Sequence, residues 1–87
     1  MKVIKEYLLN KDEISKQTLY LPKKAEIVGV QNFNDSLRLI VLGSPGEFTT
    51  LRTFKVCSSE ETIYNDTVKY IGSYLGDYGL RHIVEIF

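Results

Sequence analysis

The stretch at residues 74–87, YLGDYGLRHIVEIF, decides the fold class of this chain. Gly76 and Gly79 bracket two residues, which is typical of a tight reverse turn. If the residues after the turn alternate as in a strand, His82 and Val84 lie on one side and Ile83 on the other. Apolar residues on both sides indicate a strand that is covered on both faces. The stretch therefore predicts a β-hairpin that closes an all-β fold.

The rest of the chain repeats this pattern of short apolar runs separated by turn residues. Runs rich in Val, Ile, Leu, Thr, Phe and Tyr are interrupted by Gly, Pro, Asn or Asp. Residues 60–67 lack a clear strand pattern and are interpreted as one helical turn or a surface loop. The sequence predicts one all-β domain over residues 1–87, a small antiparallel β-sandwich or partly open barrel of about six or seven strands with at most one short helical turn. We expect strands near residues 2–9, 17–22, 25–33, 36–43, 48–57, 68–75 and 79–87.

The turns, and one strand that is apolar on both of its faces, add detail to this prediction. Asn34 and Asp35 are suited to the tip of a hairpin, and Pro22 falls at a strand end, where a missing N–H costs little. The strand expected over residues 36–43 is largely apolar on both sides, which places it at the centre of a sheet or at an interface. In so small a chain, we expect one remaining apolar face to meet another subunit in a homo-oligomer.

Composition excludes several classes of partner. The chain has 87 residues with 11 basic and 11 acidic side chains, so its net charge of zero argues against duplex nucleic acid and against an anionic membrane. The single cysteine, Cys57, cannot form an internal disulfide. The N-terminal MKVIKEYLLN lacks the apolar run of a signal peptide or membrane span, so we expect a soluble, cytoplasmic protein.

Motifs for catalysis, metals and cofactors are missing from the sequence. One histidine and one cysteine are too few for a zinc site without carboxylates or a second subunit. The segment GSPGEFTT lacks the lysine of a phosphate-binding loop, and no G-x-G-x-x-G follows a strand. Cys57 and His82 can be neighbours, but a buried thiol beside a half-buried imidazole is favoured over a catalytic pair. We expect no catalytic residue, no metal and no cofactor.

Side chains that interrupt apolar strands are the candidates for ligand binding. His82 lies on an apolar face, where an imidazole is either hydrogen-bonded structurally across strands or lines a pocket. Arg52 can clamp an anion or form a salt bridge, and Arg38 and Arg81 invite the same two interpretations. Four tyrosines in the C-terminal third, Tyr64, Tyr70, Tyr74 and Tyr78, can form a stacking or interface surface, although sheet packing explains many of them. The predicted ligand-binding residues are Arg52, His82, Arg38, Tyr70, Tyr74 and Arg81.

The order of short motifs resembles a widespread family of small phage and prophage proteins of unknown function. The motifs are VIKEYLL, LPKKAEIVGVQ, LRLIVLG, LRTFKV, YIGSYL and HIVEIF. The family pattern runs I-W-K-Y, P-K-G-A, I-L-S-V-Q, R-T-F-R, G-T-G-H, Y-I-G-T and H-V-F-E. The residues that match it are Pro22, Lys23, Ala25, Val30, Gln31, Arg52, Thr53, Phe54, Tyr70, Ile71, Gly72, His82 and Glu85. The chain departs from the pattern at Glu6 and Tyr7, where the Trp is missing, and at CSSEET, which replaces the G-T-G-H segment with its second histidine.

The resemblance implies a biological setting more than a mechanism. Small phage proteins without catalytic constellations often act as stoichiometric binders. The leading hypothesis is a phage-encoded, non-enzymatic oligomer in the cytoplasm of the infected bacterium, which counters host immunity by sequestering a small anionic signal such as a cyclic nucleotide in a pocket between subunits. Arginines would clamp phosphates and tyrosines would stack bases. The alternatives are an anti-CRISPR-like inhibitor that binds a host defence protein directly, a phosphodiesterase-like enzyme with His82 as general base, and a virion assembly protein.

Overall fold

The computed structural model describes residues 1–65 and 67–87 and confirms the all-β fold. Seven strands form two antiparallel sheets, and no helix occurs in the described residues. The strands are β1 (Val3–Leu9), β2 (Gln17–Pro22), β3 (Glu26–Phe33), β4 (Ser36–Gly43), β5 (Thr49–Ser58), β6 (Val68–Gly76) and β7 (Gly79–Ile86). Each expected strand is present, with ends that differ by at most one residue.

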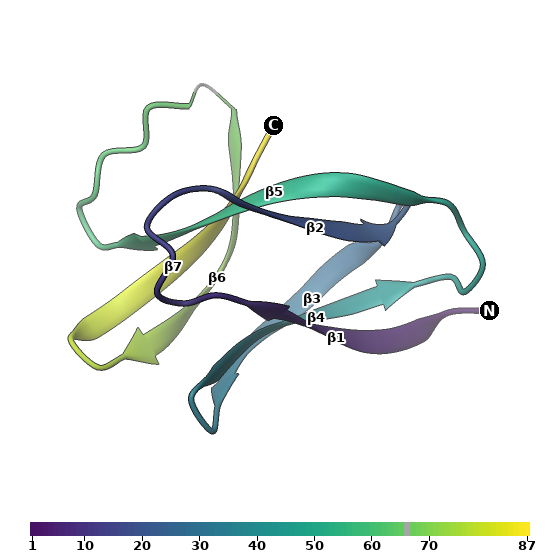
Figure 1. Cartoon of the computed structure of the whole chain (residues 1–87), viewed down its shortest axis with the longest axis horizontal. Helices are drawn as coiled ribbons and strands as arrows, with labels where there is room; N and C mark the ends of the chain where they lie inside the picture. Colours follow the sequence, from purple (N-terminus) through teal and green to yellow (C-terminus); the bar gives the residue numbers. More distant parts are fainter. Residues whose placement is uncertain (66) are drawn as a thin grey trace.

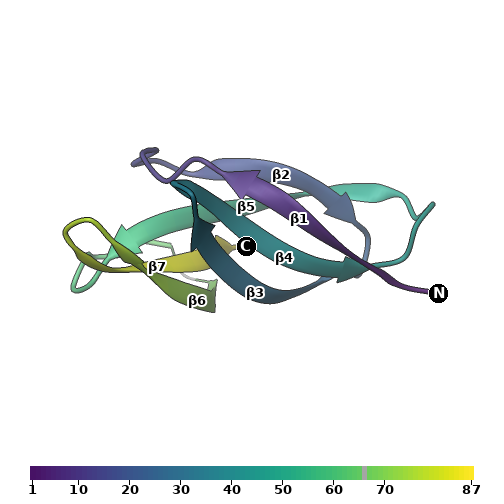
Figure 2. The same cartoon turned by 90° about the horizontal axis from the view of Figure 1, so that it is seen from below.

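The two sheets have three and four strands. The three-stranded sheet has the order β1-β4-β3, and the four-stranded sheet has the order β2-β5-β7-β6 (Figure 1). Only β3–β4 and β6–β7 are hairpins of consecutive strands, and the other neighbours join segments that are distant in the sequence. Figure 2 shows β1, β4 and β3 side by side as one layer of this sandwich.

The predicted turns form at the positions where the sequence carries turn residues. Asn34 and Asp35 both adopt positive φ, 49° and 64°, as the two central residues of a type I′ hairpin turn require. Gly76 pairs with Gly79 across the β6–β7 turn, and Gly79 has a φ of 127° that favours glycine. Pro22 is the last residue of β2. The connection from β5 to β6 carries no helix at residues 60–65 or 67, and Asp66 lies outside the described residues.

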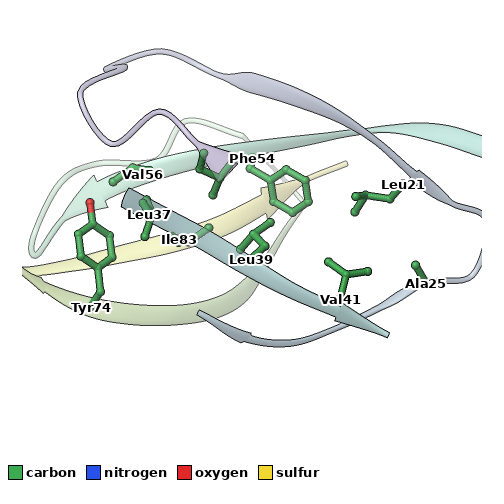
Figure 3. Close-up of a cluster of buried hydrophobic side chains, with 10 residues drawn as sticks. Leu21, Ala25, Leu37, Leu39, Val41, Phe54, Val56, Tyr74 and Ile83 are labelled. Carbon is green, nitrogen blue, oxygen red and sulfur yellow. The ribbon is translucent and has the colours of Figure 1, made fainter. Parts of the chain in front are cut away.

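The core lies between the sheets. Alternate residues of the central strand β4, Leu37, Leu39 and Val41, point inward and are almost completely buried. They pack against side chains of the four-stranded sheet that include Phe54 and Ile83 (Figure 3). The expectation that this strand lies at the centre of a sheet is therefore confirmed.

The sheets also approach each other along one lateral edge. The edge strands β3 and β6 lie side by side, and Gly72 faces Val30 there. A Cβ atom at position 72 would lie 2.9 Å from Val30 Cγ2, which is closer than packed carbon atoms come. A glycine at this position therefore lets the two edge strands meet.

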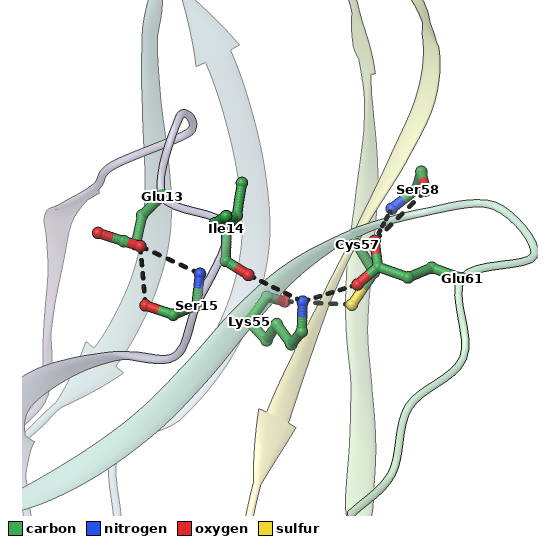
Figure 4. Close-up of polar contacts among 7 residues, drawn as sticks. All are labelled: Glu13, Ile14, Ser15, Lys55, Cys57, Ser58 and Glu61. Atoms are coloured by element: carbon green, nitrogen blue, oxygen red, sulfur yellow. Dashed lines mark hydrogen bonds and ion pairs between the residues drawn. The ribbon is translucent and has the colours of Figure 1, made fainter.

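A second, smaller apolar cluster lies on the outer face of the four-stranded sheet. Cys57, Val84 and Ile86 are buried there beneath Ile63, which belongs to the β5–β6 connection. Lys55 holds this connection in place, because its Nζ donates to Glu61 Oε2 at 2.7 Å and to the carbonyl of Ile14 at 3.1 Å (Figure 4). The chain thus covers one of its own outer apolar surfaces.

Candidate functional site

Arg52 is engaged in a buried ion pair. Its Nε and Nη2 donate to the two carboxylate oxygens of Glu85 at 2.6 and 2.7 Å, and its Nη1 donates to the carbonyl of Ala25 at 2.7 Å. Glu85 is only 2% exposed, and its carboxylate raises the pKa of Arg52. All three guanidinium nitrogens have an acceptor within the protein, as expected for a structural salt bridge rather than for an anion clamp.

Arg38 is also paired. It lies on the outer face of the three-stranded sheet, where its Nη1 donates to Glu6 Oε1 at 2.9 Å. Both side chains are partly exposed, so this pair lies at a surface that solvent reaches.

His82 and Tyr70 meet on the outer face of the four-stranded sheet. The Nδ1 of His82 is hydrogen-bonded to the Tyr70 hydroxyl at 3.0 Å, and its Nε2 to Ser59 Oγ at 2.9 Å. Sequence reasoning named His82 and Tyr70 separately but missed Ser59, since no strand pattern places the β5–β6 connection over the sheet. Both ring nitrogens have partners, as the cross-strand structural interpretation requires.

Cys57 lies directly opposite His82 in the pairing of β5 with β7. Its thiol is hydrogen-bonded to the carbonyl of Lys55 rather than to the imidazole, and burial raises its pKa. A neutral thiol is a poor nucleophile. The two residues are therefore neighbours, and in the described residues no hydrogen bond joins the thiol to the imidazole.

Tyr74 and Arg81 come together in a polar pocket at one end of the sandwich. Its lining comes mainly from the β1–β2 connection and the β6–β7 hairpin, two segments found toward the left of Figure 1, with Asn32 added from β3. Its volume is about 240 Å³. We call it the Arg81 pocket; it is lined by Lys11, Asp12, Ile14, Asn32, Tyr74, Gly76, Asp77, Tyr78 and Arg81.

Arg81 is the feature that distinguishes this pocket. Its Nε is buried and has no hydrogen-bond partner among the described residues. Of the three arginines, Arg38 and Arg52 form ion pairs, whereas Arg81 forms none with any residue in the described part of the chain. The stem of Arg81 passes close to Gly76, where a Cβ would lie 3.0 Å from Arg81 Cγ. The missing side chain of Gly76 thus leaves room for the aliphatic stem of Arg81.

Tyr74 forms the inner wall of the Arg81 pocket. It is 8% exposed and stands at the end of the core next to Leu37 and Val56 (Figure 3). Burial raises the pKa of its hydroxyl, which therefore keeps its proton at neutral pH. The group is available as a hydrogen-bond donor beside Arg81.

The rim of the Arg81 pocket carries charges of both signs. Lys11 is bonded to Asp35, and this contact raises the pKa of the lysine. Asp12 and Asp77 add two carboxylates to the lining. Lys11 and Arg81 are opposed by Asp12, Asp77 and Asp35, so the pocket has no excess positive charge and its electrostatics argue against a polyanion. The alternation pattern gave no signal for Lys11, Asp12 or Asn32, because loops and hairpin ends position them.

Metal-binding clusters and membrane-spanning helices are absent from the residues that the structure describes. Among residues 1–65 and 67–87, no three His, Cys, Asp or Glu side chains lie close enough together to hold a metal ion. Within the same residues, no helix is long and apolar enough to cross a membrane.

Comparison with known proteins adds no relative. No family model, no curated protein and no solved structure matches the chain. The resemblance to small phage proteins therefore rests on the short motifs alone.

Proposed function

We propose that this protein is a non-enzymatic binding protein that takes one anionic group of a small ligand in the Arg81 pocket. The observation that carries the proposal is the buried Nε of Arg81, which has no acceptor in the described residues. A buried donor without an acceptor costs roughly 1–3 kcal/mol, and a rotation of the Arg81 side chain that brings Nε to a ligand oxygen in the pocket would remove this cost. The Tyr74 hydroxyl lies in the same pocket and supplies a second donor.

The size of the Arg81 pocket limits what one subunit can enclose. Its volume of about 240 Å³ is below the roughly 300–1,000 Å³ of pockets for drug-sized ligands. A single phosphate or carboxylate with a small neighbouring group fits this space, whereas a cyclic dinucleotide does not. A nucleotide would place one phosphate at Arg81 and extend over Tyr78, which is completely exposed and offers a ring for stacking.

The biological setting of this binding activity is part of the proposal and rests on the sequence resemblance. In that setting a phage supplies the protein to the cytoplasm of its bacterial host, where it sequesters an anionic immune signal such as a cyclic nucleotide. A ligand of that size would place one phosphate in the Arg81 pocket and leave its remaining atoms outside it.

Direct binding to a protein is the second candidate function. It is favoured by large apolar side chains that the fold leaves in solvent, since Ile14, Phe48 and Tyr64 are 84%, 89% and 89% exposed. Aromatic side chains of this kind often anchor protein interfaces. This function predicts a stable protein complex and no stabilisation by small anions.

A ligand-dependent shift in melting temperature tests the pocket. We would titrate the protein with inorganic phosphate, then with mononucleotides and cyclic dinucleotides, and recover each ligand afterwards. At 100 times the dissociation constant, binding adds about 2.7 kcal/mol to the free energy of unfolding, which raises the melting temperature of so small a domain by about 10 °C or more.

The variants for this experiment are Arg81→Gln and, as a matched control, Lys69→Gln, which removes a positive charge from an exposed side chain outside the pocket. We expect Arg81→Gln to abolish the shift and Lys69→Gln to retain it, with the ligand recovered intact. An equal shift in Arg81→Gln, or no shift with any of these anions, would contradict the proposal. Conversion of the ligand would instead favour the phosphodiesterase alternative with His82 as general base.

A further inference from the structure

The outer face of the three-stranded sheet is an apolar surface that the protein leaves open. Because Leu37, Leu39 and Val41 point into the core, their neighbours on β4 point outward. The face defined in this way, which we call the β1–β4 face, consists of Ile4, Glu6, Leu8, Arg38, Ile40 and Leu42. Ile4 and Leu8 at its edge are 67% and 64% exposed.

The chain itself covers the middle of the outer face of the four-stranded sheet, although Tyr20 and Leu51 on that face stay exposed. On the four-stranded sheet, Ile63 of the β5–β6 connection covers Cys57, Val84 and Ile86. On the three-stranded sheet, the register places Ile4 beside Leu42, and Gly29 of β3 beside Ile40. Since Gly29 has no side chain, the central aliphatic residue of the face is not shielded from that side. An exposed aliphatic surface of this kind is typical of an interface.

The charges on the β1–β4 face identify its occupant. On β1 and β4, Glu6 and Arg38 pair with each other at 2.9 Å. Beside them Glu26 of β3, opposite Leu42, pairs with Lys2 at 3.9 Å. These two pairs leave no net charge, so the face favours neither a basic nor an acidic partner. A second copy of the same face, turned by a two-fold rotation, presents Arg38 to Glu6 and Glu6 to Arg38. The face is therefore complementary in charge to itself.

We propose that the protein forms a two-fold homodimer in which the β1–β4 faces of two copies pack together. The aliphatic side chains of Ile4, Leu8, Ile40 and Leu42 form the apolar contact. Glu6 of each protomer forms an ion pair with Arg38 of its partner. The dimer is independent of ligand binding, because none of these residues lines the Arg81 pocket.

The size of the face indicates a weak, reversible dimer. Three strands of seven or eight residues make a surface of about 14 Å by about 25 Å. Two such faces bury about 700 Å² in total, which is below the roughly 1,200–2,000 Å² of stable interfaces and falls in the range of weak, transient contacts. We therefore expect dissociation in the micromolar range.

The test is a charge exchange between two variants. The mass of the purified protein in solution is measured by sedimentation from about 1 µM to about 500 µM, a range that brackets micromolar dissociation constants. The wild-type mass should rise from 10.0 kDa toward twice that value. Glu6→Arg makes positions 6 and 38 both positive and Arg38→Glu makes them both negative, so each variant alone should stay monomeric. A mixture of the two should form a heterodimer, because the contacts between positions 6 and 38 across its interface are then between opposite charges.

The mixture separates the proposal from simple loss of folding. Circular dichroism and the melting temperature establish that each variant is folded before it is mixed. A wild-type protein that stays monomeric over the whole range would overturn the proposal. So would single variants that still dimerise, because another surface would then be in contact, and so would a mixture that remains monomeric.

Discussion

At the scale of single residues, the contact between Arg52 and Glu85 is the one whose loss we expect to cost most. Glu85 is buried and receives two hydrogen bonds from the guanidinium group, so removal of Arg52 leaves an uncompensated carboxylate in the interior. Arg52→Met should lower the free energy of unfolding by about 3 kcal/mol. Urea denaturation measures this change. The double variant Arg52→Met, Glu85→Leu should recover most of the loss, and a double variant as unstable as the sum of the single variants would contradict this account.

Cys57 should make the protein sensitive to alkaline pH. Burial raises its pKa in the folded state, so above the unfolded value of about 8.5 the unfolded chain loses the thiol proton first. Below that pH the protonated thiol makes its full contribution to the free energy of unfolding. Above it the free energy of unfolding falls by about 1.4 kcal/mol per pH unit, until the pKa of Cys57 in the folded state is reached. Urea denaturation at pH 7.5, 8.5 and 9.5, values that span this window, should show a steeper decline for wild type than for Cys57→Ser. Parallel declines would rule out this role of the thiol.

The three arginines show how much of a single residue's environment the sequence predicts. Alternation in the sequence identified Arg38, Arg52 and Arg81 as charges within apolar strands, and this much is a property of each strand alone. Their different situations depend on which strand lies opposite. Arg52 meets Glu85 and Arg38 meets Glu6 across strands that are far apart in the sequence, whereas Arg81 meets no acceptor in the described residues. Register between distant strands is not contained in local periodicity.

At the scale of strands, the contact between β3 and β6 depends on a missing side chain. A Cβ at Gly72 would lie 2.9 Å from Val30 Cγ2, so Gly72→Ala forces the two edge strands apart. We expect a loss of about 1–3 kcal/mol, as for other overpacked sites. Thermal and urea denaturation of Gly72→Ala, Val30→Ala and the double variant form a cycle. Val30→Ala makes room for the added methyl group, so the double variant should be more stable than the sum of the single losses predicts, and simple additivity would refute the steric explanation.

Strand positions were predictable because turns and alternation are local signals. The pair Asn34 and Asp35, the glycines at 76 and 79, and Pro22 all mark strand ends in the sequence and in the structure. The pairing of β1 with β4 and of β2 with β5 was not predictable from such signals. It follows from how two amphipathic sheets bury their apolar faces together, which is a property of all the strands at once.

At the scale of the whole molecule, the Arg81 pocket could likewise not be predicted from local sequence signals. It is assembled from the β1–β2 connection, the end of β3 and the β6–β7 hairpin, three segments that only the complete sandwich brings together. Sequence reasoning selected Tyr74 and Arg81 from strands, but it had no means of adding Lys11 and Asn32 from the other two segments. The pocket therefore exists because the strand topology brings these three segments together. The side chains that line it determine which ligands it can bind.

The same topology should make folding slow. Only β3–β4 and β6–β7 are local hairpins, and the other strand pairs close long loops before their contacts form. We expect refolding in milliseconds to seconds, followed in stopped flow by fluorescence of the six tyrosines, since the chain has no tryptophan. If the hairpins form first, Asn34→Ala, at a turn position with positive φ, should mainly slow refolding. Thr18→Ala, in the long-range pair of β2 with β5, should instead mainly speed unfolding. Refolding well below a millisecond, or the reverse assignment of the two variants, would show that long-range pairing precedes the hairpins.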